Sequence, residues 1–322
     1  MDDEIAWLLT GYPWVQYHTR IDLLHEPPDD PQVDLARQEM VNHPQVQALV
    51  RGLQNWGSEP LKSHKSAGHP IHQLSFLADL GLKATDPGMA QVCNAIMAHR
   101  SEEGPFQTLL QTAVHFGGDG KNHWAWMLCD APLLVYCLAK FGLAEEPQVQ
   151  QAFHYLLGLA QDNGWRCTVS SEMGRFRGPG NKNDLCPYAT LLILKALSAM
   201  PTSAENEAAR RASAEALMQL WEQRTKRRPY LFAMGADFRK VKAPFIWYDL
   251  LHVLEVLSAF EWLHDDARMI EMADCLRSKA DAQCLFTPES VWKAWGEWDF
   301  GQKKTPSQWL TLLAQRILYR LG

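Results

Sequence analysis

The sequence lacks an excess of positive charge, because its 322 residues carry a net charge of −6 at pH 7. Proteins that bind nucleic acids in general are usually basic, so this balance argues against a nucleic-acid partner. No apolar run reaches the roughly 18 residues of a membrane-spanning helix. The N-terminus, Met1-Asp2-Asp3-Glu4, lacks the basic start of a secretory signal peptide. We therefore expect no membrane span and a cytoplasmic protein.

Disulfide and strand signals are also scarce. The seven cysteines are irregularly spaced, which predicts reduced thiols in a cytoplasmic setting. Sustained alternation of apolar and polar residues, the usual sign of a half-buried strand, is not found. Hydrophobic residues nevertheless make up 47% of the chain and include 13 tryptophans, enough for a large core. These observations together predict an all-α protein.

Prolines recur along the chain at long, similar intervals. Apolar segments open on a proline after a polar or glycine-containing loop, and a further segment begins near His123. These prolines are Pro13, Pro70, Pro187, Pro244 and Pro306. Proline is favoured at the first helical position, and a period of roughly 50 to 60 residues indicates stacked supersecondary units. Each unit holds two helical patterns, which predicts one (α/α)₆ toroid domain, a barrel of six helical hairpins, over residues 1–322.

The helices of this toroid can be placed approximately. The inner helices are expected over 13–25, 70–81, 124–141, 187–200, 244–262 and 306–321. The outer helices are expected over 31–55, 87–99, 147–160, 204–224 and 266–280, and they carry more charge because they face solvent.

Aligned inner-helix ends place a polar residue at an equivalent position in four repeats. Counting back eight residues from Leu77, Leu138, Leu194 and Leu257 reaches His69, Asp130, Cys186 and Asp249, respectively. This pattern predicts a shared polar layer in which Asp130 and Asp249 are candidate catalytic residues. The alternative is that His69 and Cys186 cap helices and that the two aspartates are exposed on the surface.

Cations gather just before three consecutive inner helices. Arg175, Arg177 and Lys182 precede the fourth, Arg239, Lys240 and Lys242 the fifth, and Lys303 and Lys304 the sixth. Because the N-terminus of a helix disfavours cations, this placement does not serve helix stability. It predicts an anion site, for example for a diphosphate. The alternative is ordinary solvated surface.

A short motif contains possible metal ligands. The motif consists of Asp184 and Cys186. His252 lies 66 residues after Cys186. Asp, Cys and His all bind zinc, and three protein ligands leave an open catalytic position. The alternative is a buried structural thiol and a core histidine.

Residues 177–188, RGPGNKNDLCPY, resemble the zinc and diphosphate segment of protein prenyltransferase β-subunits. The helix containing His252 resembles the later segment that supplies the third ligand in that family. Residues 161–165, QDNGW, are similar to a turn of the wider terpenoid-cyclase and prenyltransferase superfamily, whose fold is an (α/α)₆ toroid. Relative to the family pattern, Lys182 lies one residue closer to the aspartate and Tyr188 one residue further from the cysteine.

The resemblance implies zinc bound by Asp184, Cys186 and His252. It implies that Arg177, Lys182 and Tyr188 face the diphosphate, and the other predicted anion-site cations are Lys240, Lys242 and Lys303. It also implies a partner α-subunit. The Asp-x-Asp-Asp motif of protonation-type triterpene cyclases is absent from the sequence.

We therefore carry three functional hypotheses forward. The first is a zinc-dependent, prenyltransferase-like enzyme acting on an isoprenoid diphosphate or another apolar anionic small molecule. Zinc would activate a thiol, and the cations would stabilise the departing diphosphate. The second is a metal-free terpenoid lyase, isomerase or cyclase with Asp130, Asp249 and Cys186 as acid–base groups. The third is a non-catalytic carrier of lipids or anions. Aromatic residues such as Trp247 and Trp292 could wall an apolar cavity in each case.

Overall fold

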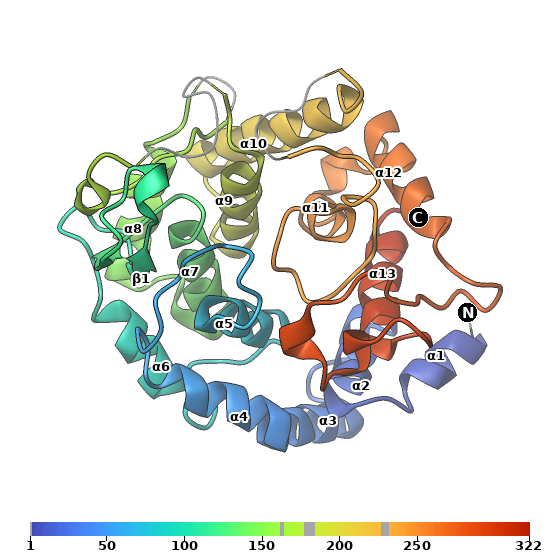
Figure 1. Cartoon of the computed structure of the whole chain (residues 1–322). Helices are drawn as coiled ribbons and strands as arrows, with labels where there is room; N and C mark the ends of the chain where they lie inside the picture. The colour runs from blue at the N-terminus through green and yellow to red at the C-terminus, as the bar shows by residue number, and fades with distance from the viewer. Residues whose placement is uncertain (1, 162–163, 177–183, 227–231) are drawn as a thin grey trace. The chain divides into compact units, whose positions relative to one another are not determined.

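The computed structural model describes residues 2–161, 164–176, 184–226 and 232–322 (Figure 1). The chain divides into two compact units. Unit 1 consists of Met1–Ala48 and Gly235–Gly322, and unit 2 of Leu49–Met234. Regular structure is mostly helical in both units, which confirms the all-α prediction in its general form. Closure of the helices into one toroid domain stays a prediction.

Three buried helices form the centre of unit 2. They are α5 (Pro70–Asp79), α7 (Ala131–Leu138) and α9 (Pro187–Ala199), and α7 packs against both others, as Figure 1 shows. Their apolar side chains are almost continuous, so they bury every face, as core helices do. Three more helices follow them in sequence: α6 (Met89–Met97), α8 (Pro147–Leu157), which packs on α7, and α10 (Ala204–Glu222), which packs on α9.

Unit 2 also contains a small antiparallel sheet that the sequence analysis missed. Strand β1 (Thr108–Gln111) pairs with β2 (Asn122–Ala125), so that Leu109 lies opposite Trp124. The helix expected over 124–141 therefore begins only at Ala131, because Trp124 and Ala125 take part in strand pairing. The turn η3 (Ala139–Leu143) follows α7 directly, and Gly142, with a φ of 94°, breaks the helical path within it. Short 3₁₀ turns η2 (Val114–Phe116) and η4 (Ser171–Met173) also lie in this unit.

Unit 1 is built around α13 (Gln308–Arg320). This helix contacts α1 (Asp2–Leu8), α2 (Pro13–His18), α11 (Leu250–Leu257) and α12 (Ala267–Arg277). Helix α2 continues as the π-helical turn η1 (Thr19–Leu23) and packs on α3 (Pro31–Asn42). The 3₁₀ turns of this unit are η5 (Glu261–Leu263), η6 (Lys293–Trp295) and η7 (Asp299–Gly301). Helix α4 (Pro44–Leu53) crosses the boundary between the two units in sequence.

Only some of the repeating prolines open helices. Pro13, Pro70 and Pro187 are the first residues of α2, α5 and α9, as predicted. Pro244 is not a helix start, because α11 begins at Leu250, after Asp249 caps it. Similarly, α13 begins at Gln308, where the Ser307 side chain accepts the N–H of Leu310.

The equivalent polar positions found in the sequence are helix starts. His69, Asp130, Cys186 and Asp249 are the residues immediately before α5, α7, α9 and α11. Helix capping of α5 by His69 and of α9 by Cys186 is thereby confirmed. Surface exposure of the two aspartates is wrong, since Asp130 is 0% and Asp249 1% exposed. The internal repeat thus marks four polar residues that are buried in the structure.

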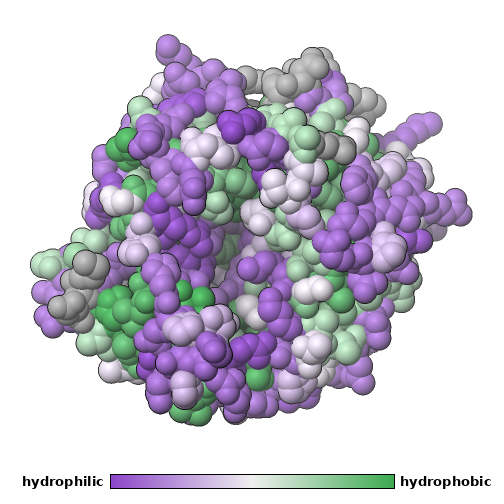
Figure 2. Space-filling view, turned by 180° about the vertical axis from the view of Figure 1, so that it is seen from behind, coloured by the Kyte–Doolittle hydropathy of each residue, from purple (hydrophilic) through white to green (hydrophobic). Residues whose placement is uncertain are grey.

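Figure 2 shows one face on which hydrophilic side chains cover most of the area and hydrophobic side chains form smaller patches. In the described ranges, no helix combines the length and apolar character needed to cross a bilayer.

Candidate functional site

The predicted site residues are divided between the two units. Unit 2 contains Asp130, Asp184, Cys186 and Tyr188, whereas unit 1 contains Lys240, Lys242, Asp249, His252 and Lys303. Arg177 and Lys182 lie outside the described residues. Each unit therefore offers its own group of polar side chains.

Asp249 is the most unusual group in unit 1. Its Oδ1 accepts the backbone N–H of His252 at 3.0 Å, which caps α11. Its Oδ2 is buried and accepts no hydrogen bond from the described residues. Among the described residues, the cation that pairs with it is Lys242, whose Nζ lies 3.7 Å from Oδ2. That separation is an ion pair and is too long for a hydrogen bond.

Burial raises the pKa of Asp249 to about 6, and the nearby Lys242 ammonium opposes a larger rise. Desolvation disfavours the charged carboxylate, while the cation favours it. A carboxyl with this pKa exchanges its proton close to neutral pH. Such perturbed groups are concentrated at functional sites, although structural ion pairs also produce them.

Lys242 itself is buried between an acid and an aromatic ring. Its Nζ lies 4.9 Å from the ring centroid of Trp292, in addition to its pairing with Asp249. Two other cations of the predicted anion site have different surroundings. Lys240 pairs with the exposed Asp237 at 3.2 Å, and Lys303 is exposed. Lys242 therefore forms an ion pair with Asp249. The position of Lys242 in the sequence, shortly before a helix, did not predict this pairing.

His252 lies one turn into α11, next to Phe245. Its Nδ1 donates to the carbonyl of Trp247 at 3.0 Å, and its ring stacks on Phe245 at 5.0 Å. With Nδ1 protonated, Nε2 of the neutral ring is the basic nitrogen. A fixed Nδ1–H is the usual arrangement in histidines that bind a metal or accept a proton through Nε2.

In unit 2, Asp130 has partners for both carboxyl oxygens. Oδ1 accepts the N–H of Met127 at 2.8 Å, and Oδ2 lies 3.4 Å from Nε2 of His64. The His64 ring also meets the edge of Tyr188, with ring centroids 6.4 Å apart. The sequence analysis missed His64, because it lies in a loop 66 residues before Asp130 and carries no motif.

Two further histidines beside this group are structural. His69 accepts the N–H of Ile71 through Nδ1 at 3.2 Å and donates from Nε2 to the carbonyl of Glu59 at 3.1 Å. His72 donates to the carbonyl of His64 at 3.0 Å. Burial lowers the pKa of His69 and lowers that of His72 to about 3. Both rings are therefore neutral at physiological pH.

Cys186 shares its environment with two other cysteines. Its Sγ accepts the N–H of Ala189 at 3.5 Å. A hydrogen bond from Cys129 holds the pKa of the Cys186 thiol below its usual value. Cys167 also lies nearby, because its segment pairs in part with residues beside Cys129 and Cys186. None of the seven cysteines, all in the described part of the chain, forms a disulfide.

The predicted zinc ligands fit zinc by chemistry, because carboxylate, thiolate and imidazole groups all bind zinc and the His252 ring is oriented by its Nδ1–H bond to the Trp247 carbonyl. Asp184 and Cys186 belong to unit 2 and His252 to unit 1, so their meeting stays a prediction. Among the residues that the structure describes, no group of three His, Cys, Asp or Glu side chains is placed to hold a metal ion.

No protein-family model and no curated protein matches this chain. Solved structures do. A protein from Actinoplanes is 15% identical, with a TM-score of 0.44, and the match covers 96% of this chain and 90% of that one. A variant of the type II terpene cyclase MstE from Scytonema, in complex with geranylgeranyl dihydroxybenzoate, is 12% identical, with a TM-score of 0.40 and coverages of 96% and 86%. Both matches have low sequence identity and a TM-score below 0.5, so they carry no argument about the function of this chain.

Proposed function

We propose that this protein is an acid–base enzyme that transfers a proton to carbon in an apolar, terpenoid-like substrate, as a lyase, isomerase or cyclase does. The observation that carries the proposal is Asp249, a buried carboxyl with a pKa of about 6 and a second oxygen that accepts no hydrogen bond from the described residues. A general acid works best when its pKa lies near the working pH.

The neighbours of Asp249 suit a proton donor. In the proposed step, the proton leaves Oδ2 and bonds to one carbon of a double bond, whose π electrons form the new C–H bond. The adjacent carbon becomes cationic. A C–H on a carbon next to the cationic centre then gives its proton to the Asp249 carboxylate, so that the isomeric double bond forms and Asp249 is protonated again. Lys242, 3.7 Å away, stabilises the carboxylate that remains. Phe245, whose ring stacks on His252, and Trp292, whose ring lies 4.9 Å from Lys242 Nζ, would supply aromatic surface that tolerates positive charge.

Deuterium incorporation tests this proposal directly. Wild type would be incubated in D₂O with a panel of terpenoid alcohols, beginning with geranylgeraniol, and the recovered alcohols analysed by mass spectrometry. We expect deuterium at carbon with wild type and little with Asp249→Asn, which keeps the shape and the capping oxygen. Incorporation that persists unchanged in Asp249→Asn would refute the role of Asp249.

A second candidate is the zinc-dependent prenyltransferase-like reaction on an isoprenoid diphosphate. The lowered pKa of Cys186 and the fixed Nδ1–H of His252 favour it. Zinc, when bound by Asp184, Cys186 and His252, would deprotonate an incoming thiol. Tyr188 and the cations Arg177, Lys182, Lys240, Lys242 and Lys303 would hold the diphosphate, with a partner subunit contributing the acceptor.

Elemental analysis separates the two candidates. The zinc proposal expects one zinc per wild-type chain and much less in Cys186→Ala, with Cys275→Ala as the matched control. Equal zinc in all three proteins, or none in any, would refute that site. Calorimetry with farnesyl diphosphate would then show whether an anion binds independently of the metal.

A further inference from the structure

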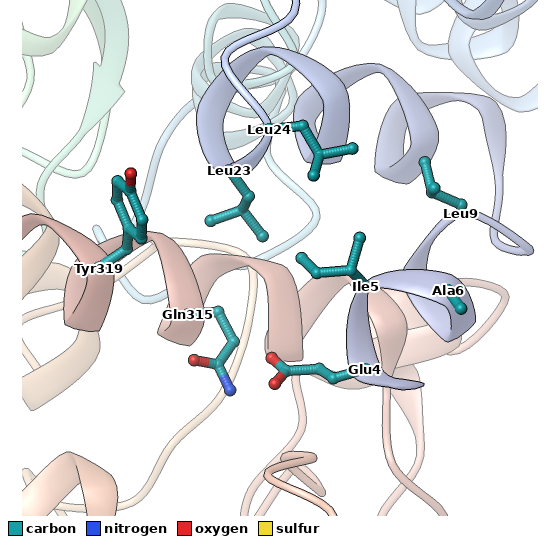
Figure 3. A pocket seen from close by; sticks show the side chains of 8 residues that line it. All are labelled: Glu4, Ile5, Ala6, Leu9, Leu23, Leu24, Gln315 and Tyr319. Carbon is teal, nitrogen blue, oxygen red and sulfur yellow. The ribbon is translucent and has the colours of Figure 1, made fainter. Parts of the chain in front are cut away.

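Unit 1 contains a cavity of about 380 Å³ between α1, η1 and α13, shown in Figure 3. This volume lies within the range of roughly 300 to 1,000 Å³ that is usual for small-ligand sites. The side chains of Ile5, Leu9, Leu23 and Leu24 make most of its wall. Leu24 is 40% exposed, so the apolar wall is open to solvent on one side. The cavity shares no lining residue with the site around Asp249.

One end of this cavity is polar. Figure 3 shows the carboxylate of Glu4 and the amide of Gln315 at the same end, on α1 and α13. Glu4 is only 9% exposed, and no hydrogen bond or ion pair joins its side chain to the described residues. Burial raises the pKa of the Glu4 carboxyl, and the N-terminal ammonium opposes that rise. Gln315 donates from Nε2 to the carbonyl of Cys284 at 2.9 Å, which leaves Oε1 as an acceptor. The polar end thus presents acceptors that would suit a ligand with N–H donors.

The rim of the cavity is held in place by a contact between two segments far apart in sequence. Tyr319 lines the cavity, and its hydroxyl lies 3.0 Å from Nε2 of His25. The two rings are 5.2 Å apart. His25, which follows directly on Leu24, has a φ of 53°, a left-handed conformation that is uncommon among residues other than glycine. The site is therefore largely formed before a ligand arrives, which lowers the entropic cost of binding.

We propose that this cavity binds a small amphiphilic amine. Its alkyl or aryl body packs against Ile5, Leu23 and Leu24, and its protonated amino group meets Glu4 and Gln315. The charge of Glu4 selects a cation, and the apolar wall selects against small hydrophilic amines. This inference is independent of the proposed reaction at Asp249.

Calorimetry with three probes of equal chain length tests the charge selection. Octylammonium should bind more tightly than octanol, and octanoate should bind least. Glu4→Gln should weaken octylammonium roughly tenfold or more, the size of a hydrogen bond to a charged group, while octanol changes less than about twofold. Glu39→Gln removes an exposed carboxyl on α3 and should leave the affinities for all three probes unchanged.

Two more variants test the geometry. Gln315→Leu removes the second acceptor and should weaken octylammonium more than octanol. Leu23→Ser breaks the apolar wall and should weaken both probes. Circular dichroism would confirm that each variant is folded. Binding of octanoate as tight as that of octylammonium, an unchanged affinity in Glu4→Gln, or no binding of any probe would overturn the proposal.

Discussion

Asp249 in unit 1 and Asp130 in unit 2 stand at the same place in their repeats, immediately before a buried helix. Both use Oδ1 to accept a backbone N–H, at 3.0 Å for Asp249 and 2.8 Å for Asp130. Their second oxygens differ. Oδ2 of Asp130 faces the His64 ring at 3.4 Å, whereas Oδ2 of Asp249 accepts no hydrogen bond from the described residues and lies 3.7 Å from the ammonium of Lys242.

This difference shows that an aspartate immediately before a helix is not a catalytic acid by virtue of that position alone. One oxygen of Asp249 caps α11, and one oxygen of Asp130 accepts the N–H of Met127, which precedes α7. The surroundings of the other oxygen decide what each group can do. Where histidine occupies that side, as for Asp130, the carboxyl holds loop and helix together. Where burial dominates, as for Asp249, the proton is retained to higher pH and becomes available for chemistry. The predictions below test this contrast.

The largest expected effect is on proton transfer. Asp249→Asn should lower the rate of deuterium incorporation by roughly 10² to 10⁴, the usual contribution of a general acid. Asp130→Asn should lower it less than about tenfold, because Asp130 is proposed to hold structure. The two rates would be measured side by side by mass spectrometry. Equal losses in both variants would break the contrast between the two aspartates.

The next effect is on the pH dependence of stability. Below the unfolded-state pKa of 3.8, Asp249 is protonated in both states, and between 3.8 and about 6 only the folded state keeps the proton. The free energy of unfolding should therefore fall as pH rises through this window, by at most about 3 kcal/mol for a shift of about 2 units.

Urea unfolding of wild type and Asp249→Asn at several pH values measures the contribution of Asp249 to the free energy of unfolding. The difference between the two proteins should change between about pH 4 and pH 6 and be constant above that. Asp22, whose pKa His18 and Arg316 lower against the opposing effect of burial, contributes at lower pH and is common to both proteins. A flat difference across the window would show that Asp249 titrates normally.

A smaller effect on the free energy of unfolding is expected from removing the carboxyl group of Asp130. Asp130→Ala removes the acceptor of the Met127 N–H and the partner of His64, and should lower the free energy of unfolding by about 2 kcal/mol. The matched control is Ser203→Ala, which removes an exposed cap of α10 and should cost about 0.5 to 1 kcal/mol. A cost for Asp130→Ala no larger than that of the control would show that burial and His64 add nothing.

The smallest effect is expected at Lys240. Its pair with Asp237 is exposed, so Lys240→Ala should change the free energy of unfolding by less than about 0.5 kcal/mol. Buried Lys242 offers the contrast, because its replacement by methionine leaves the Asp249 carboxyl without its neighbouring cation. A cost at Lys240 equal to that at Lys242 would contradict the assignment of their roles.

Local signals in the sequence predicted much of the helical framework. Pro70 and Pro187 mark the starts of α5 and α9 because proline at a first helical position needs no tertiary support. Pro244 misled the prediction of α11, since the capping carboxyl of Asp249 determines where that helix begins. Trp124 was placed in a helix because its strand partner, Leu109, lies across a loop that no local pattern reveals.

In the candidate site, too, residues marked by a local pattern were predicted, whereas contacts between distant segments were not. The repeat identified Asp130, Cys186 and Asp249, because equivalent helix starts recur at a regular count from the helix ends. It did not identify His64 or Cys129, whose roles depend on contacts between segments distant in sequence. The sequence also showed that Lys242 is a cation but not that its side chain is buried beside Asp249. A pattern records residue types, whereas side-chain direction is decided by tertiary packing.

The composition of unit 1 has a consequence for how the protein is made. Helices α1 and α2 leave the ribosome before their partner α13, which spans residues 308–320. At a synthesis rate of about 5 to 20 residues per second, they wait on the order of tens of seconds for it. Unit 2 is continuous in sequence and is complete well before α13 emerges. During that interval the nascent N-terminal helices expose the apolar surface that α13 will cover, which makes them natural clients of chaperones.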